Sequence, residues 1–234
     1  MMNDRLPLLL IPGLLCTARL WEHQTSTLTD VAVPSVIDHR HHKTVGDLAR
    51  HILKNAPPRF ALAGLSMGGY TAMEIFRQAP DRVDRIAFLD TSYKADRPEQ
   101  SEGRRDAMER AQKMGIAEVH ASLVTGWVAP ERLKDTAFMA DALEMAEETG
   151  VEGFINQQQV IMSRPDSTET LRQIGCPALV LVGALDTLTP VELHEEMADI
   201  IPGAVLEIID GCGHLSAMES PKAVSDCLRT WLNR

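Results

Sequence analysis

Six apolar runs recur along the chain, separated by polar stretches. The runs cover residues 6–13, 31–38, 59–66, 85–92, 177–186 and 204–210. They are continuous rather than alternating, which is typical of parallel strands buried on both faces. Helical patterns follow Thr44, Ser66 and Thr189 and occupy the C-terminal segment, so helices are available to cover both faces. The pattern predicts an α/β fold, doubly wound around a mostly parallel six-stranded sheet.

The recurring apolar runs that predict strands are absent between Asp90 and Cys176. Polar, helix-rich segments take their place, at residues 99–115, 116–128, 130–150 and 151–167. None of them contains an apolar run that fits a buried strand. We therefore expect about four helices outside the sheet, as an insertion rather than a second independent core.

Composition limits the class of partner. The chain has 234 residues, of which 44% are hydrophobic and 24% charged, which suits a single domain. Its net charge of −10, with no cluster of Lys and Arg, argues against nucleic acid and anionic membranes as partners. A small-molecule substrate fits better, and the oligomeric state is left open.

The N-terminal segment 1–16 is apolar enough to be compared with a secretion signal. Asp4 weakens its basic start, Pro7 and Pro12 interrupt the apolar run, and Leu15 before Cys16 is too large for a cleavage site. The cysteines show no metal-ligand spacing and suit a reducing compartment: Cys16, Cys176, Cys212 and Cys227. We expect a cytoplasmic protein without a membrane span.

Residues 60–70, FALAGLSMGGY, contain the pattern G-x-S-x-G. Gly64 and Gly68 flank Ser66 at the end of a predicted strand and the start of a predicted helix. A turn this sharp strains the serine backbone and needs neighbours without side chains, and it exposes the hydroxyl above the sheet. A plain tight turn or a phosphate-binding turn is the alternative for such a short pattern.

A serine nucleophile needs a histidine base and an acid that orients it. Asp186 and His214 follow later predicted strands in the chain order serine, acid, histidine, and parallel sheets place such residues at one edge. Taken singly, Asp186 could cap a helix and His214 could be a loop residue. Asp90, at the end of another strand, competes for the role of acid, although a turn-bonding role suits it better.

The histidine-rich run HRHH at residues 39–42 raises the question of a metal site. No acidic or cysteine partner stands beside it at ligand spacing, so we interpret it as a solvated loop rather than a metal site.

An acyl-transfer site also needs two backbone N–H groups that stabilise an oxyanion. Met67, directly after the serine, is one candidate. The second should come from the loop after the first strand, where Gly13 permits a tight turn and either Leu14 or Leu15 can direct its N–H inward.

The segments GLSMGG, GALDTLTP and GCGHLSAMESP resemble the α/β-hydrolase superfamily in its compact, esterase-like branch. The resemblance covers nearly the whole chain outside residues 95–165. It implies a Ser66, Asp186 and His214 triad, no metal, no cofactor, and a fold that lacks the family's first two strands. It also implies a core of residues 1–94 and 166–234, with residues 95–165 as a helical lid. The family's usual His-Gly before the oxyanion residue is Pro12-Gly13 here, which leaves the choice between Leu14 and Leu15 open.

The reaction that these residues favour is hydrolysis of a small carboxylic ester through an acyl-enzyme. Thioester, amide, lactone or C–C bond hydrolysis on the same triad is the alternative within enzymes. A ligand-binding protein on the same scaffold is the alternative from another class.

Bulky residues of the insertion and of the oxyanion loop are candidates for substrate contact: Leu15, Cys16, Trp127, Phe138 and Met162. Arg164 could bind a substrate carboxylate, or pair with an acid and anchor the end of the insertion. From Arg97 to Glu152 the insertion carries seven basic and twelve acidic side chains. An acidic, apolar cover of this kind predicts a preference for compact neutral esters over anionic ones.

Overall fold

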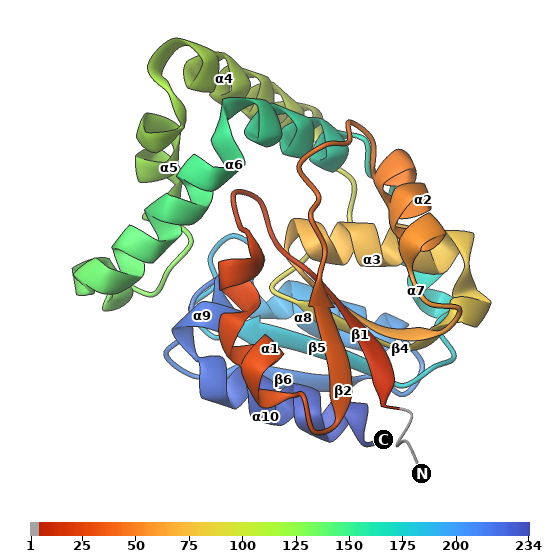
Figure 1. The fold of residues 1–234 in the computed structure, drawn as a ribbon. Helices are drawn as coiled ribbons and strands as arrows, with labels where there is room; N and C mark the ends of the chain where they lie inside the picture. Colours follow the sequence, from red (N-terminus) through yellow and green to blue (C-terminus); the bar gives the residue numbers. More distant parts are fainter. Residues whose placement is uncertain (1–4) are drawn as a thin grey trace.

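The sheet occupies the centre of the molecule, whose computed structural model describes residues 5–234 (Figure 1). Its strands are β1 (Leu6–Ile11), β2 (Ala32–Val36), β3 (Phe60–Leu65), β4 (Val83–Leu89), β5 (Ala178–Gly183) and β6 (Val205–Ile209). They lie in the order β2-β1-β3-β4-β5-β6, and every neighbouring pair is parallel. The predicted six-stranded doubly wound sheet is confirmed. Residues 1–4 of the predicted core segment lie outside the described range.

Side chains alternate between two apolar layers, one on each face of the sheet. Leu8 and Leu10 of β1 belong to the same core layer as Trp231 of the C-terminal helix, whereas Leu9 and Ile11 belong to the layer that contains Leu48 of the helix after β2. The helices around the sheet are α1 (Glu22–Thr27), α2 (Val45–Asn55), α3 (Met67–Gln78), α7 (Thr168–Arg172), α8 (Val191–Ile200), α9 (Ser216–Glu219) and α10 (Pro221–Leu232), with 3₁₀ helices η1 (Ala18–Trp21) and η2 (Pro80–Arg82).

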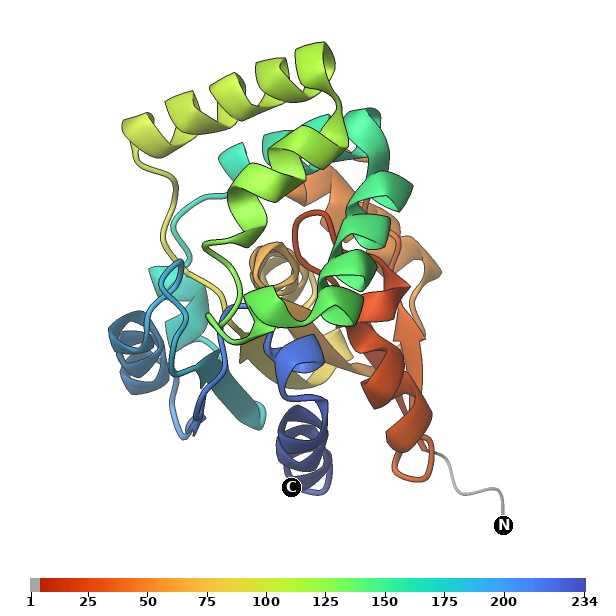
Figure 2. The ribbon, with the colours of Figure 1, turned by 90° about the vertical axis from the view of Figure 1, so that its left-hand side faces the viewer.

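The segment between β4 and β5 is helical, as expected. It comprises α4 (Pro98–Met114), α5 (Ile116–Val124), η3 (Arg132–Lys134) and α6 (Thr136–Met162). Gly150 interrupts α6 with φ 67° and ψ 175°, at the boundary between two of the predicted helices. Figure 2 shows these helices as a layer apart from the sheet and its flanking helices. We call residues 98–162 the helical cover. No helix among residues 5–234 is long and apolar enough to cross a membrane.

Candidate active site

The turn from β3 to α3 holds Ser66 in a strained conformation, with φ 54° and ψ −115°. A Cβ at Gly64 would overlap the backbone carbonyl of Gly68, and one at Gly68 would overlap the carbonyl of Ile11. A side chain at either position would therefore force the backbone to shift, and the turn persists because close backbone packing on both sides determines it. The hydroxyl of Ser66 stands at the carboxyl edge of the sheet.

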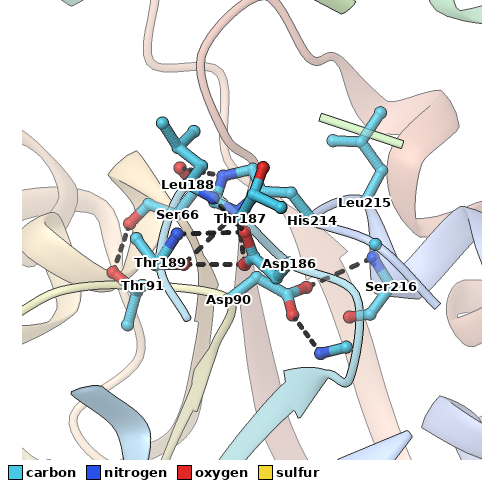
Figure 3. A network of polar contacts seen from close by, with 12 residues as sticks. Ser66, Asp90, Thr91, Asp186, Thr187, Leu188, Thr189, His214, Leu215 and Ser216 are labelled. Atoms are coloured by element: carbon cyan, nitrogen blue, oxygen red, sulfur yellow. Dashed lines mark hydrogen bonds and ion pairs between the residues drawn. The ribbon is translucent and has the colours of Figure 1, made fainter. Parts of the chain in front are cut away.

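Ser66, His214 and Asp186 form one hydrogen-bonded chain, although they come from three separate loops (Figure 3). Nε2 of His214 lies 2.9 Å from Oγ of Ser66, and Nδ1 lies 2.7 Å from Oδ2 of Asp186. All three residues are at most 9% exposed. This geometry suits transfer of the serine proton to an imidazole that a carboxylate orients.

Asp186 is held by the residues that follow it. Its Oδ1 accepts hydrogen bonds from the N–H groups of Leu188 and Thr189, at 2.9 and 3.0 Å, and its Oδ2 accepts the hydroxyl of Thr189 at 2.7 Å. Burial raises the pKa of Asp186, but the charge of His214 and these hydrogen bonds outweigh burial and hold the pKa below its usual value. Asp186 is thus an anion that faces the imidazole.

Asp90 is fully buried beside this chain and contacts backbone. One oxygen accepts the N–H of Gly183 at 3.0 Å, and the other accepts the N–H of Ser216 at 3.2 Å (Figure 3). Burial and then the charge of Asp186 raise the pKa of Asp90. Asp90 therefore joins β4, β5 and the segment after His214, while Asp186 makes the contact with the imidazole.

The loop that carries His214 is held by Glu219, which the sequence interpretation did not single out. Its carboxylate accepts the N–H groups of Ala129, Gly213 and Leu215 at 2.8, 3.0 and 3.0 Å. Burial lowers the pKa of His214, but Asp186, and then Asp90 and Glu219, more than offset burial and raise it above its ordinary value. The neighbouring carboxylates, Asp186 above all, thus favour the protonated imidazole.

Hydrogen bonds in the loop after β1 distinguish Leu14 from Leu15 as the second oxyanion donor. The N–H of Leu15 donates to Oε1 of Gln157 on α6, at 3.0 Å, so it is already engaged. The N–H groups of Leu14 and Met67 have no acceptor within residues 5–234. The ring of His39 also contacts this loop, with Nε2 3.0 Å from the carbonyl oxygen of Gly13.

His39 corrects the interpretation of the histidine run as wholly solvated. It is 1% exposed, and burial lowers its pKa to about 4, so the ring is neutral. A neutral ring donates its Nε2–H to the Gly13 carbonyl and so helps to hold the loop in place. Within the described part of the chain no group of three or more His, Cys, Asp or Glu side chains is arranged to hold a metal.

Ser66 and His214 line a cavity of about 350 Å³ between the sheet edge and the helical cover. Its apolar wall includes Leu14, Cys16, Leu123, Trp127, Ile161 and Leu188. Burial raises the pKa of the Cys16 thiol to about 12, so this neighbouring thiol is not an activated nucleophile. The size and lining suit a small, largely apolar ligand.

Of the residues predicted to contact substrate, Cys16 and Trp127 line this cavity. Leu15, Phe138 and Met162 are not among its lining residues, which corrects their predicted placement. Leu15 is buried in the core with its backbone at φ 58°, and the ring of Phe138 lies 5.5 Å from the guanidinium of Arg132 instead. Sequence position within the helical cover did not reveal which face of each helix meets the cavity.

The prediction of an acidic cover over the site is wrong at the cavity wall. The charged side chains that line it, apart from the histidine, are cationic: Lys94, Arg97, Arg104 and Arg164. The acids of the cover do not line the cavity, because a net count over a segment does not specify which face of each helix carries the charge.

Arg164 makes the anchoring contacts that were one of its two predicted alternatives. It pairs with Asp96 at 2.7 Å and donates to the carbonyls of Lys94 and Ile161 at 2.9 and 3.0 Å. Its guanidinium also lies 4.3 Å from the centre of the Tyr70 ring. The residue ties the end of α6 to the segment that leaves β4.

The sequence of the chain is similar to the sequences of known hydrolases. Residues 8–226 match the sequence profile of the alpha/beta hydrolase family. The chain is similar to 3-oxoadipate enol-lactonase 2 of Acinetobacter baylyi, with 23% identity over 76% of this chain and 65% of that relative. The match therefore spans less than two thirds of that relative's length.

Solved structures extend the similarity over the whole fold. A thermophilic esterase from Thermogutta terrifontis superimposes with a TM-score of 0.88 at 29% identity, over 97% of this chain and 89% of that one. An enol-lactonase from Burkholderia xenovorans gives a TM-score of 0.89 over 100% and 94% of the two chains, and at 22% identity it supports the fold alone.

Proposed function

Because this chain belongs to the alpha/beta hydrolase family, we propose that it is a serine hydrolase that cleaves a small carboxylic ester, open or cyclic, through an acyl-enzyme. The observation that carries the proposal is the hydrogen-bonded chain from Ser66 through His214 to Asp186. The esterase and lactonase names of its relatives support ester chemistry in general.

In the proposed first step, Oγ of Ser66 attacks the ester carbonyl carbon while its proton passes to Nε2 of His214, 2.9 Å away. The imidazolium forms 2.7 Å from Asp186, whose negative charge stabilises it. His214 then protonates the departing alkoxide as the C–O bond breaks. Water, deprotonated by the same imidazole, attacks the acyl carbon; the bond to Oγ of Ser66 then breaks, the imidazolium returns the proton to Oγ, and the acid is released.

The oxyanion of both steps is proposed to accept hydrogen bonds from the N–H groups of Leu14 and Met67. Both groups lack an acceptor within residues 5–234, and Leu14 lines the cavity with Ser66. Each such donor typically contributes about 10²-fold to 10³-fold in rate. Leu15 is not proposed as a donor, because Gln157 already accepts its N–H.

The chemistry is proposed to reside in the core of residues 1–94 and 166–234, with residues 95–165 acting as a lid. A ligand-binding role on the same scaffold is disfavoured by the strain at Ser66, whose φ is 54°. A protein that only binds would gain nothing from a strained residue beside a buried histidine and carboxylate.

Labelling and turnover together test this function. A neutral fluorophosphonate should react covalently with Ser66, and para-nitrophenyl butyrate should be hydrolysed. Ser66→Ala should remove labelling and lower turnover on the order of 10⁴-fold or more, because triad members act as a unit. Unlabelled wild-type protein, or hydrolysis by Ser66→Ala near the wild-type rate, would contradict the proposal.

A further inference from the structure

The positive charge on the cavity wall lies in the helical cover and in the segments directly before and after it. Arg104 and Arg164 both pair with Asp96, at 2.6 and 2.7 Å. The side chain of Asp96 is only 2% exposed and does not itself line the cavity. One carboxylate thus balances two guanidinium groups, and one positive charge of the trio is left uncompensated at the cavity.

Arg97 adds a second positive charge. Its backbone N–H donates to Oε1 of Gln100, but its guanidinium has no carboxylate or carbonyl acceptor within residues 5–234. The side chain is exposed and lines the cavity that contains Ser66. Lys94 differs, because Glu196 pairs with it at 2.7 Å. No carboxylate lines the cavity to oppose Arg97.

We infer that this cavity selects esters or lactones that carry a carboxylate away from the bond that is cleaved, with Arg97 and Arg104 as its binding site. The inference rests on the proposed function and names its substrate class. The planar guanidinium group suits a carboxylate because it can donate two parallel hydrogen bonds. Apolar residues such as Leu123 and Trp127 line the rest of the cavity, where they can contact the hydrocarbon between the two ends.

This arrangement reverses the selectivity expected from the acidic composition of the helical cover. Arg97 and Arg104 stand on or beside α4, whose acids face elsewhere than the cavity. A substrate carboxylate would therefore meet uncompensated positive charge and no like charge at the wall.

Two matched pairs of esters test the inference. The first pair places the carboxylate on the acyl side of the scissile bond, and the second places it on the leaving-group side. The first compares para-nitrophenyl butyrate with the mono-para-nitrophenyl ester of glutaric acid. The second compares phenyl acetate with para-acetoxybenzoate. In at least one pair, wild-type kcat/KM should be higher for the anionic ester, and the advantage should shrink between about 0.01 M and about 1 M salt as screening increases.

Arg97→Gln should lower the ratio of anionic to neutral kcat/KM roughly tenfold or more, the usual effect of one charged hydrogen bond. The matched control is Arg105→Gln, which makes the same change on an exposed side chain of α4 that does not line the cavity. It should leave the ratio unchanged. A ratio that is insensitive to Arg97→Gln in both pairs, or equally sensitive to Arg105→Gln, would overturn the inference.

A binding measurement separates this inference from the proposed function. Glutarate should raise the melting temperature of wild-type protein, since a ligand that binds the folded state stabilises it, and should raise that of Arg97→Gln less. Stabilisation that depends on Arg97 without hydrolysis of any ester would contradict the proposed reaction and support the anion site. Hydrolysis of both ester types with no dependence on Arg97 would overturn the anion site alone.

Discussion

The carboxyl edge of the sheet and the helical cover differ in how tightly their residues are constrained. At the sheet edge, a Cβ on Gly64, Gly68 or Gly183 would overlap neighbouring backbone. In the helical cover, a Cβ on Gly103 would meet nothing within 4 Å, and α4 buries one residue, Ala111, out of 17. The chemistry thus stands on tightly packed backbone, whereas α4 of the cover can vary its side chains at little cost.

Polar contacts join the sheet edge to the helical cover, so the two regions are not independent of each other. Gln157 of α6 accepts the N–H of Leu15 in the oxyanion loop, at 3.0 Å. The carbonyl of Trp127 accepts the N–H of His214 at 2.6 Å. The cover therefore supports two loops of the candidate active site, rather than only shaping access to it.

The largest expected effect lies within the sheet edge and distinguishes its two buried acids. Asp186→Asn should lower kcat/KM by about 10⁴-fold, because the imidazole loses the anion that fixes its tautomer and stabilises its charge. Asp90→Asn should lower it far less, since Asp90 contacts the backbone of Gly183 and Ser216. Steady-state kinetics on variants with native circular dichroism measure the difference. A larger loss for Asp90→Asn would move the acid to β4.

A pair of glycine substitutions compares the rigidity of the two regions directly. Gly64→Ala should destabilise the fold by about 3 kcal/mol or more, because its methyl group would overlap the carbonyl of Gly68. Gly103→Ala should stabilise it by about 0.5–1 kcal/mol, since this helical position has open space and alanine is the better helix former. Urea unfolding gives both values. Equal changes in the free energy of unfolding at Gly64 and Gly103 would contradict the expected difference in rigidity.

A smaller effect is expected where the cover supports the chemistry. Gln157→Leu should lower kcat about tenfold to 100-fold while KM changes little, because the oxyanion loop loses the acceptor that holds Leu15. Gln157→Glu, whose carboxylate can still accept that N–H, should retain more activity than Gln157→Leu.

The matched control for this contact is Gln159→Leu on the same helix, whose side-chain oxygen has no partner within residues 5–234. It should leave kcat within about twofold of wild type, as substitutions away from special contacts usually do. If Gln157→Leu behaved like this control, the helical cover would be independent of the oxyanion loop.

The smallest expected effect concerns pH. His214 must be neutral to accept a proton, so kcat/KM should rise with pH to a plateau. Because the surrounding anions raise the pKa of His214, the midpoint should lie above about 6.5, the ordinary value. Because burial and the charge of Asp186 raise the pKa of Asp90 to about 8, Asp90 is mostly protonated below that pH, and Asp90→Asn should leave the midpoint nearly in place. A clear shift of the midpoint to lower pH would show that Asp90 is charged beside the imidazole.

Features that depend on near neighbours along the chain were determined by the sequence itself. Continuous apolar runs indicated six strands, of which the edge strands β2 and β6 are only partly buried, and Gly150 divided the predicted helices where α6 is interrupted. The pattern around Ser66 indicated a strained turn, because the steric demand of that turn falls on residues only two positions away. These signals arise from local backbone geometry and side-chain periodicity, although the carbonyl that excludes a side chain at Gly68 belongs to Ile11 of the distant strand β1.

Only the tertiary structure decided which distant groups meet. It brought Asp186 to His214, gave the N–H of Leu15 to Gln157, and turned Arg97 toward the cavity while the acids of α4 face elsewhere. It also placed Phe138 away from that cavity. The physical reason is that these contacts join residues up to 142 positions apart, and which face of a helix meets a cavity depends on how whole elements pack, which no local pattern specifies.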